Sequence, residues 1–88
     1  MRKIYPKNII EIIKNARNPF EYDEHYYFTE VQIIEGKTSI RITGDIWKAT
    51  RFNEMTEIEQ NAWYKFIKSF FGKHYTVNFK TISLTYDI

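Results

Sequence analysis

Apolar residues near the start of the chain recur at the spacing of an α-helix. They would form one stripe along a helix of about 3.6 residues per turn, and they are Ile9, Ile12, Ile13 and Ala16. Pro6 suits a first helical position, where its missing N–H has no helical partner to lose. Asn18 and Pro19 are typical of the residues that follow a helix. The pattern therefore predicts a helix at about residues 6–17.

Apolar and polar residues alternate on both sides of Gly36, which predicts a β-hairpin with Gly36 in its turn. In the register that we favour, Val31 faces Ile40, and the apolar side chains share one face of the ribbon. Glu30 then faces Arg41 on the other face, where opposite charges attract. The same register predicts the cross-strand pairs Ile33–Thr38, Gln32–Ser39, Thr29–Ile42, Phe28–Thr43, Tyr27–Gly44 and His25–Ile46.

A second helix is predicted to begin near Thr56. Thr56 and Glu59 have the spacing of a capping box, in which each side chain bonds a free backbone N–H of the first turn. A wide apolar stripe follows at helical spacing, and it consists of Ile58, Ala62, Trp63, Phe66, Ile67 and Phe70. Gly72 and Lys73 are typical C-terminal signals, so the helix should end near Gly72.

The last segment, residues 75–88, alternates like a β-strand but changes phase along its length. The apolar positions are Val77 and Phe79 in one phase and Ile82, Leu84 and Tyr86 in the other. One extra residue near Lys80 and Thr81 would bring both sets onto the same face. We therefore expect a β-bulge there.

These elements follow one another as helix, strand, strand, helix and strand, which predicts a single small α+β domain over residues 1–88. A two-stranded hairpin is marginally stable by itself, so the last strand should complete a three-stranded, mostly antiparallel sheet. We favour the strand order 3-1-2, with the last strand beside the first strand of the hairpin, over the order 1-2-3, which requires a right-handed parallel crossover. The two helices would pack on one face of the sheet and leave the other face to solvent.

Composition limits the compartment in which the protein works and the kinds of site that it can form. The 88 residues include no cysteine, which excludes disulfides and thiolate metal sites, and aromatic residues make up 18% of the chain. The longest apolar run, IIEII, is interrupted by Glu11, so we expect no membrane span. The first residues, MRKIYPKN, lack the apolar stretch of a signal peptide. We therefore expect a cytoplasmic protein, which would act in the host cytoplasm if it is viral.

The charged residues alternate in short blocks. The net charge of +2 is too small to indicate a nucleic-acid partner by itself. Residues 18–35 carry five acidic side chains and no lysine or arginine, whereas residues 61–80 carry four lysines and no acid. These blocks predict local patches on a folded surface rather than a charged disordered tail.

The stretch EYDEHYY, residues 21–27, concentrates carboxylates, a histidine and tyrosines. Asp23 and His25 would share a strand face and could bind a metal ion together with Glu21. A metal site needs three or four convergent ligands, and the sequence leaves open whether His74, the other histidine, comes near His25. We favour the interpretation in which the acids lie in a solvated loop, and we expect neither a metal ion nor another cofactor.

The recognised catalytic motifs are missing from the chain. It has no cysteine nucleophile and no Gly-x-Ser-x-Gly elbow, and its three glycines stand too far apart to form a phosphate-binding loop. We therefore expect that the protein is not an enzyme.

One alternative function is nucleic-acid binding. The basic side chains that could follow a phosphate backbone are Arg41, Lys65, Lys68 and Lys73. Tyr26 and Phe28, on the predicted open face of the sheet, could stack on bases as the aromatic residues of RNA-recognition domains do. The sequence signatures of RNA-recognition and KH domains are absent, however.

Binding to another protein is the function that we favour. The candidate surface joins acidic and aromatic residues, which are Glu21, Tyr22, Asp23, Glu24 and Tyr26. In size, residue usage and lack of catalytic groups the chain is similar to the small virus-encoded inhibitors of bacterial defence, such as anti-CRISPR proteins. This resemblance implies a non-catalytic inhibitor of a host or defence protein, but it carries no motif and assigns no residue. The sequence leaves open whether the protein is a monomer or a homodimer.

Overall fold

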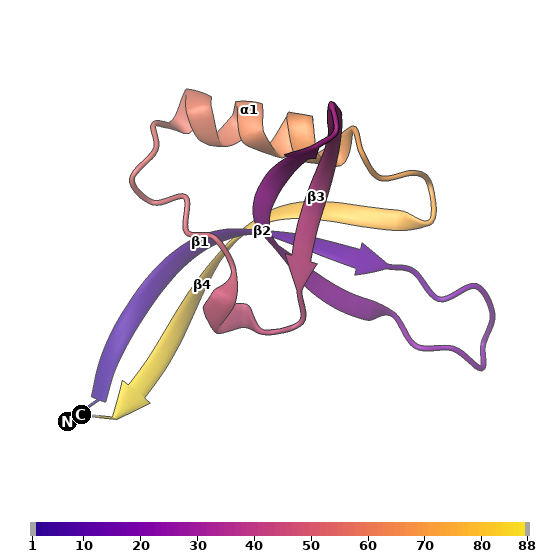
Figure 1. Cartoon of the computed structure of the whole chain (residues 1–88). Coiled ribbons are helices and arrows are strands. Elements are labelled where there is room, and N and C mark those ends of the chain that lie inside the picture. The colour runs from indigo at the N-terminus through magenta and orange to yellow at the C-terminus, as the bar shows by residue number, and fades with distance from the viewer. Residues whose placement is uncertain (1, 88) are drawn as a thin grey trace.

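Within residues 2–87 the chain forms four β-strands, one α-helix and one short 3-10 helix (Figure 1). The computed structural model describes the backbone of residues 2–87 and the side chains of residues 2–85. The elements are β1 (Arg2–Lys14), β2 (Glu24–Ile34), β3 (Lys37–Thr43), η1 (Ile46–Lys48), α1 (Glu57–Lys68) and β4 (Tyr75–Asp87). The strands form one antiparallel sheet in the order β3-β2-β1-β4. The predicted α+β fold with three strands and two helices is therefore wrong.

The predicted first helix, at residues 6–17, is wrong because these residues belong to strand β1 and the loop after it. Ile9, Ile10 and Ile12 are all 0% exposed. β1 is packed on both of its faces, against α1 on one and against η1 on the other, so consecutive residues can be buried and the strand shows no clean alternation. The β-branched isoleucines also favour a strand over a helix.

Pro6 lies within β1 without breaking its ladder to β4. The backbone groups of Asn8 point away from β4: its oxygen accepts a hydrogen bond from the Phe52 nitrogen at 2.9 Å, and its nitrogen donates to Asn53 Oδ1 at 2.8 Å. Pro6, two residues earlier, has the same orientation, and its oxygen accepts from Arg51 Nε at 3.3 Å. The missing N–H of Pro6 therefore falls on the side that β4 does not use.

The predicted strand order 3-1-2 is wrong because β1 lies between the hairpin and the last strand. β1 and β4 pair in an unbroken register from Arg2–Asp87 to Lys14–Tyr75, so the predicted bulge near residues 80 and 81 is wrong too. The change of phase has another cause. Val77 packs against the core under α1, whereas Ile82 and Leu84 lie opposite Lys7 and Tyr5, on the other face, where η1 packs.

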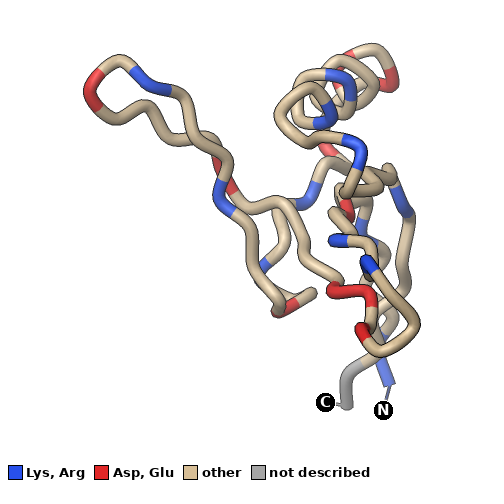
Figure 2. The backbone as a smooth tube through the Cα atoms, turned by 90° about the vertical axis from the view of Figure 1, so that its right-hand side faces the viewer, with Lys and Arg blue, Asp and Glu red and all other residues tan. Residues whose placement is uncertain are grey.

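The hairpin register is confirmed near the turn and shifts beyond it. Val31 pairs with Ile40 and Glu30 with Arg41, as predicted. A bulge between Phe28 and Glu30 then changes the register. The pairs become Phe28–Ile42 and Tyr27–Thr43, so the predicted pairs Thr29–Ile42, Phe28–Thr43, Tyr27–Gly44 and His25–Ile46 are wrong. The hairpin projects away from the rest of the molecule (Figure 2).

α1 begins as predicted and ends earlier. Thr56 and Glu59 form the capping box, and the helix stops at Lys68 rather than near Gly72. The buried core between α1 and the sheet consists of Ile10, Ile12, Phe28, Phe52, Ile67 and Val77. The segment before α1 supplies Phe52 and fills the space where β1 and β2 diverge, since Thr50 donates to the Phe28 oxygen at 2.9 Å. Within residues 2–87, no helix has both the length and the apolar character that crossing a membrane requires.

Candidate functional site

The loop between β1 and β2, residues 15–23, is fastened by its own acidic side chains. Asp23 Oδ1 accepts a hydrogen bond from the Ala16 nitrogen at 2.7 Å, and Glu21 Oε2 accepts from the Arg17 nitrogen at 3.1 Å. The prediction that the acids lie in a loop is confirmed for Glu21 and Asp23 but wrong for Glu24, which begins β2. The carboxylates of Glu21 and Asp23 also cap backbone N–H groups of the loop. They therefore hold the loop in shape.

A second set of hydrogen bonds closes the tip of this loop around Asn18. Asn18 Oδ1 accepts from the Phe20 nitrogen at 2.9 Å, and the Asn18 carbonyl accepts from the Glu21 nitrogen at 3.2 Å. The amide of Asn18 also donates to Glu21 Oε1 at 3.3 Å. This is the Asx-turn chemistry that makes asparagine frequent in turns.

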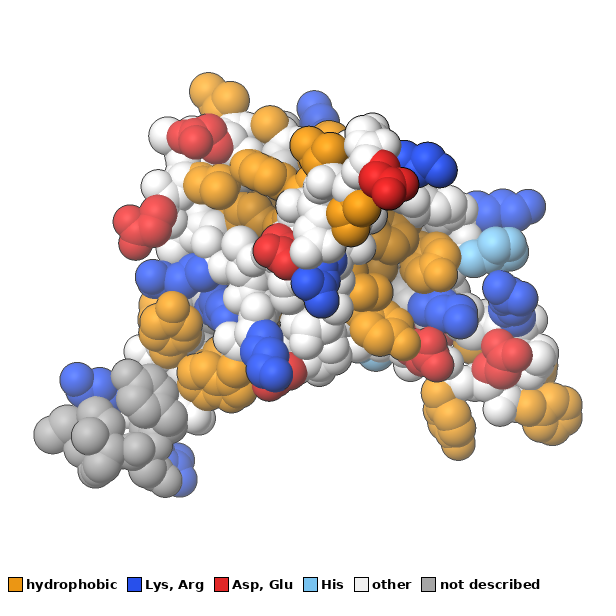
Figure 3. Space-filling view, in the orientation of Figure 1, with side chains coloured by type: hydrophobic (Ala, Val, Ile, Leu, Met, Phe, Trp, Pro, Cys, Tyr) orange, Lys and Arg blue, Asp and Glu red, His pale blue; other side chains and the backbone are white. Residues whose placement is uncertain are grey.

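Two aromatic rings stand on the fastened loop. Phe20 is 93% exposed and Tyr22 is 91% exposed, the highest values among the large hydrophobic residues of the described chain. Hydrophobic side chains are visible at the lower right of Figure 3, where the loop between β1 and β2 lies. We call residues 15–23 the aromatic loop. Sequence reasoning included Tyr22 but missed Phe20, whose signal was an aromatic residue placed between Pro19 and an acidic stretch.

The other two residues of the predicted surface leave the loop and enter β2. Tyr26 Oη donates to Glu24 Oε2 at 3.0 Å, and Glu24 also lies 3.9 Å from Lys14 Nζ. The hydrogen bond to Glu24, and then the negative charge of that carboxylate, raise the pKa of Tyr26. The ring of Tyr26 is half-buried against the core. The five predicted residues therefore do not form one flat patch: Tyr22 and Glu24 face solvent, while Tyr26 packs inward.

A hollow of about 400 Å³ lies at the base of the aromatic loop. Its lining combines both signs of charge with one ring, from Lys14, Asn15, Arg17, Glu21, Tyr22 and Glu24. A space of this size beside two exposed rings can accept a protruding side chain of a partner.

His25 contacts a buried carboxylate rather than Asp23. Glu11 is 4% exposed, and its Oε2 lies 3.5 Å from His25 Nδ1 and 3.5 Å from Lys80 Nζ. These three side chains join β2, β1 and β4 on the face opposite α1. The His74 carbonyl accepts from the Asn15 nitrogen at 2.9 Å. In the described part of the chain, no group of three His, Cys, Asp or Glu side chains could hold a metal ion.

The four basic residues of the alternative nucleic-acid site do not share a surface. Ile40 packs toward the core under α1, so its neighbour Arg41 points to the opposite face, where it pairs with Glu30 at 3.3 Å. Lys65 and Lys68 lie on α1, and Lys73 follows it. Phe28 and Tyr26 also face the core under α1 rather than an open sheet face.

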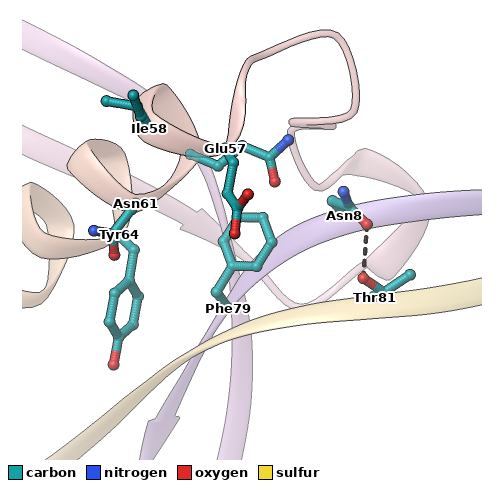
Figure 4. A pocket seen from close by; sticks show the side chains of 8 residues that line it. Asn8, Glu57, Ile58, Asn61, Tyr64, Phe79 and Thr81 are labelled. Atoms are coloured by element: carbon teal, nitrogen blue, oxygen red, sulfur yellow. Dashed lines mark hydrogen bonds between the residues drawn. The ribbon is translucent and has the colours of Figure 1, made fainter.

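A cleft of about 790 Å³ separates the first half of α1 from β1 and β4 (Figure 4). Asn8 accepts a hydrogen bond from Thr81 at 2.7 Å along its floor, and Tyr64 Oη donates to the Val77 carbonyl at 3.1 Å. Glu57 is the single carboxylate among the lining residues, and no histidine lies with it.

Comparison with known proteins found no match for this chain among family models, curated proteins or solved structures. No relative therefore assigns it a substrate, a partner or an active-site residue.

Proposed function

We propose that this protein is a non-catalytic binding module that attaches to another protein through the aromatic loop. The observation that carries the proposal is the exposure of Phe20 and Tyr22, at 93% and 91%, on a loop that its own side chains hold in shape. Aromatic residues that enter pockets of a partner dominate the binding energy of many interfaces. A loop that is already ordered loses less conformational entropy on binding.

Charged residues surround the two rings and would form the polar rim of an interface centred on them. Glu21 and Asp23 accept hydrogen bonds from the loop backbone, and further charged side chains line the hollow beside Tyr22, which are those of Lys14, Arg17 and Glu24. The side chains of Lys14 and Glu24 are 45% and 53% exposed, and an exposed pair of this kind contributes little to stability. Both groups can therefore exchange their contact for one across an interface.

The resemblance to small virus-encoded inhibitors makes a bacterial defence protein the first class of partner to test. Such an inhibitor acts by occupying a surface and needs no catalytic group. The protein would hold its aromatic loop in a groove or pocket of that partner and so exclude the partner's normal ligand.

The direct test is capture from a nuclease-treated host lysate, followed by affinity measurement with the purified partner. The variant Phe20→Ser/Tyr22→Ser removes both rings, and Ile58→Ser is the control because Ile58 is also an apolar residue with 83% exposure, but on α1. Loss of two anchoring rings should weaken binding by about 30-fold or more. The control should bind like the wild type. Equal affinity of all three proteins would remove the aromatic loop from consideration, provided that circular dichroism shows them equally folded.

A further inference from the structure

Aromatic and basic side chains gather where η1 packs on the first half of β1. Trp47 of η1 stacks on Tyr5 of β1, with ring centroids 6.3 Å apart and planes inclined by 23°. Trp47 remains 50% exposed, so part of its ring faces solvent beside the stack. We call Lys3, Tyr5, Trp47, Lys48 and Arg51 the basic-aromatic surface.

Three basic residues accompany this stack. The Arg51 guanidinium carbon lies 4.8 Å from the centre of the Tyr5 ring, Lys48 follows Trp47 directly, and Lys3 shares a strand face with Tyr5. Figure 3 shows Lys and Arg side chains around hydrophobic ones toward the lower left, in the region of η1 and β1. From this combination we infer that the basic-aromatic surface binds single-stranded nucleic acid, with a base on the exposed part of the Trp47 ring and phosphates on the cations.

The backbone of η1, which carries Trp47, is held by contacts on both sides. The buried Lys7 Nζ donates to the carbonyls of Ile46 at 3.2 Å and Trp47 at 2.8 Å. Asp45 Oδ1 accepts from the Trp47 nitrogen at 3.0 Å and caps the turn. The stacking platform therefore exists before any ligand arrives, which limits the entropy lost on binding.

Among the side chains of residues 2–85, two acids lie near this surface, and neither blocks it. The carboxylate of Asp45 accepts a hydrogen bond from the backbone of η1. Glu54 lies 3.7 Å from Arg51, but its side chain is 90% exposed. An exposed ion pair contributes little, so a phosphate can replace the Glu54 carboxylate beside Arg51. Removing that carboxylate should therefore strengthen binding.

Single strands fit this surface better than duplexes, because unpaired bases leave their ring faces free to stack. The surface is also separate from the aromatic loop, which lies at the other end of β1 (Figure 1). Binding of a nucleic acid here is therefore independent of the proposed protein contact.

The test is fluorescence anisotropy with labelled oligothymidylate and oligouridylate of about 20 nucleotides, titrated over a range of salt concentrations. The wild type should bind both at low salt, and its affinity should fall as salt rises. Trp47→Ala should weaken binding by about tenfold, whereas Trp47→Phe keeps a ring and should retain most of the affinity. Lys48→Glu/Arg51→Glu should weaken it further, and Glu54→Gln should strengthen it.

The matched control is Lys65→Glu/Lys68→Glu, which makes the same charge change on α1. The change in net charge weakens the binding of any nucleic acid to some extent. Beyond that effect, the affinity of the control should change by less than about threefold. The inference is overturned if the wild type binds neither oligonucleotide at low salt. It is also overturned if the α1 control loses as much affinity as the η1 variant, or if Trp47→Ala binds like the wild type. Phe20→Ser/Tyr22→Ser should bind the oligonucleotides normally, so failure here and failure of the proposed protein contact are distinguishable.

Discussion

The ammonium nitrogen of Lys7 lies 2.8 Å from the backbone carbonyl oxygen of Trp47. Lys7 is 4% exposed, although lysine is among the residues least often buried. The same nitrogen reaches the Ile46 carbonyl, so one side chain of β1 holds η1 against the sheet. η1 also carries Trp47, whose ring stacks on Tyr5 of the same strand.

Replacing Lys7 by methionine should destabilise the fold. The methionine fills a similar volume but leaves two partly buried carbonyl oxygens without this donor. The expected loss in the free energy of unfolding is about 1–3 kcal/mol, measured by urea denaturation. Lys3→Met, at an exposed position of the same strand, should change stability by less than about 0.5 kcal/mol. Equal losses for the two variants would show that the buried amine does not hold η1.

Stability should rise with pH on the alkaline side because of Lys7. Burial lowers the pKa of Lys7 from its ordinary value of 10.5, and the nearby Arg51 lowers it further, against the opposing effect of Asp45. Between the lowered pKa and 10.5 the unfolded chain therefore binds more protons than the folded protein, which favours the folded protein as pH rises. Urea unfolding at a series of pH values should show this rise in the wild type relative to Lys7→Met. A constant difference between the two proteins would contradict it.

Glu11 should couple His25 to Lys80 energetically. Each partner is about half exposed, at 51% and 52% of its side chain, so either single change to alanine should cost less than about 1 kcal/mol. The double variant leaves the buried carboxylate without either side-chain partner, and its cost should exceed the sum by about 1 kcal/mol. The measurement is a double-mutant cycle in urea. In a Glu11→Gln background the two changes should become additive, and additivity in the wild type would refute the coupling.

The aromatic loop should loosen when Asp23 is changed to alanine. The Ala16 amide then loses the acceptor at 2.7 Å, and its hydrogen exchange should accelerate by about tenfold. Glu24→Ala is the control, since Glu24 contacts the side chains of Tyr26 and Lys14 and not the loop backbone. An unchanged exchange rate in the Asp23 variant would mean that the carboxylate does not fasten the loop.

The hairpin turn should be improved by Glu35→Asn. Glu35 has a φ of 51° and Gly36 a φ of 77°, the positive values that a two-residue hairpin turn requires. Asparagine adopts this conformation more readily than glutamate, so the free energy of unfolding should rise by about 0.5–1 kcal/mol. Gly36→Ala should lower it by a similar amount, since a Cβ there meets no neighbour within 4 Å and only the backbone is strained. Thermal unfolding should show a higher midpoint temperature for Glu35→Asn and a lower one for Gly36→Ala than for the wild type.

Local patterns in the sequence were sufficient for the hairpin turn and the start of α1, and insufficient for β1. The capping box at Thr56 and the cross-strand pair Glu30–Arg41 depend on residues close together in the chain. The run IIEII fits both a helix and a strand buried on two faces, and only the neighbours β2 and β4 decide between them. Because residues 6–17 were predicted as a helix, β1 was missing from the predicted sheet, and the predicted strand order was therefore wrong.

The candidate surfaces were predictable only in part for the same reason. The acidic stretch marked the aromatic loop, but the bonds of Asp23 and Glu21 to the backbone depend on how the loop closes. Tyr5 and Trp47 are 42 positions apart in the sequence, and β1 and η1 bring them together. No local spacing signals that stack.

The pairing of Arg2 with Asp87 places the first residue of β1 and the last residue of β4 side by side, at one end of the longest ladder (Figure 1). A mechanical force that pulls these two residues apart acts across the ladder, in the direction of its interstrand hydrogen bonds. It therefore opens the pairs one at a time, like a zipper, instead of shearing all of them together. The protein should yield to such tension at low force, even where its resistance to urea is ordinary.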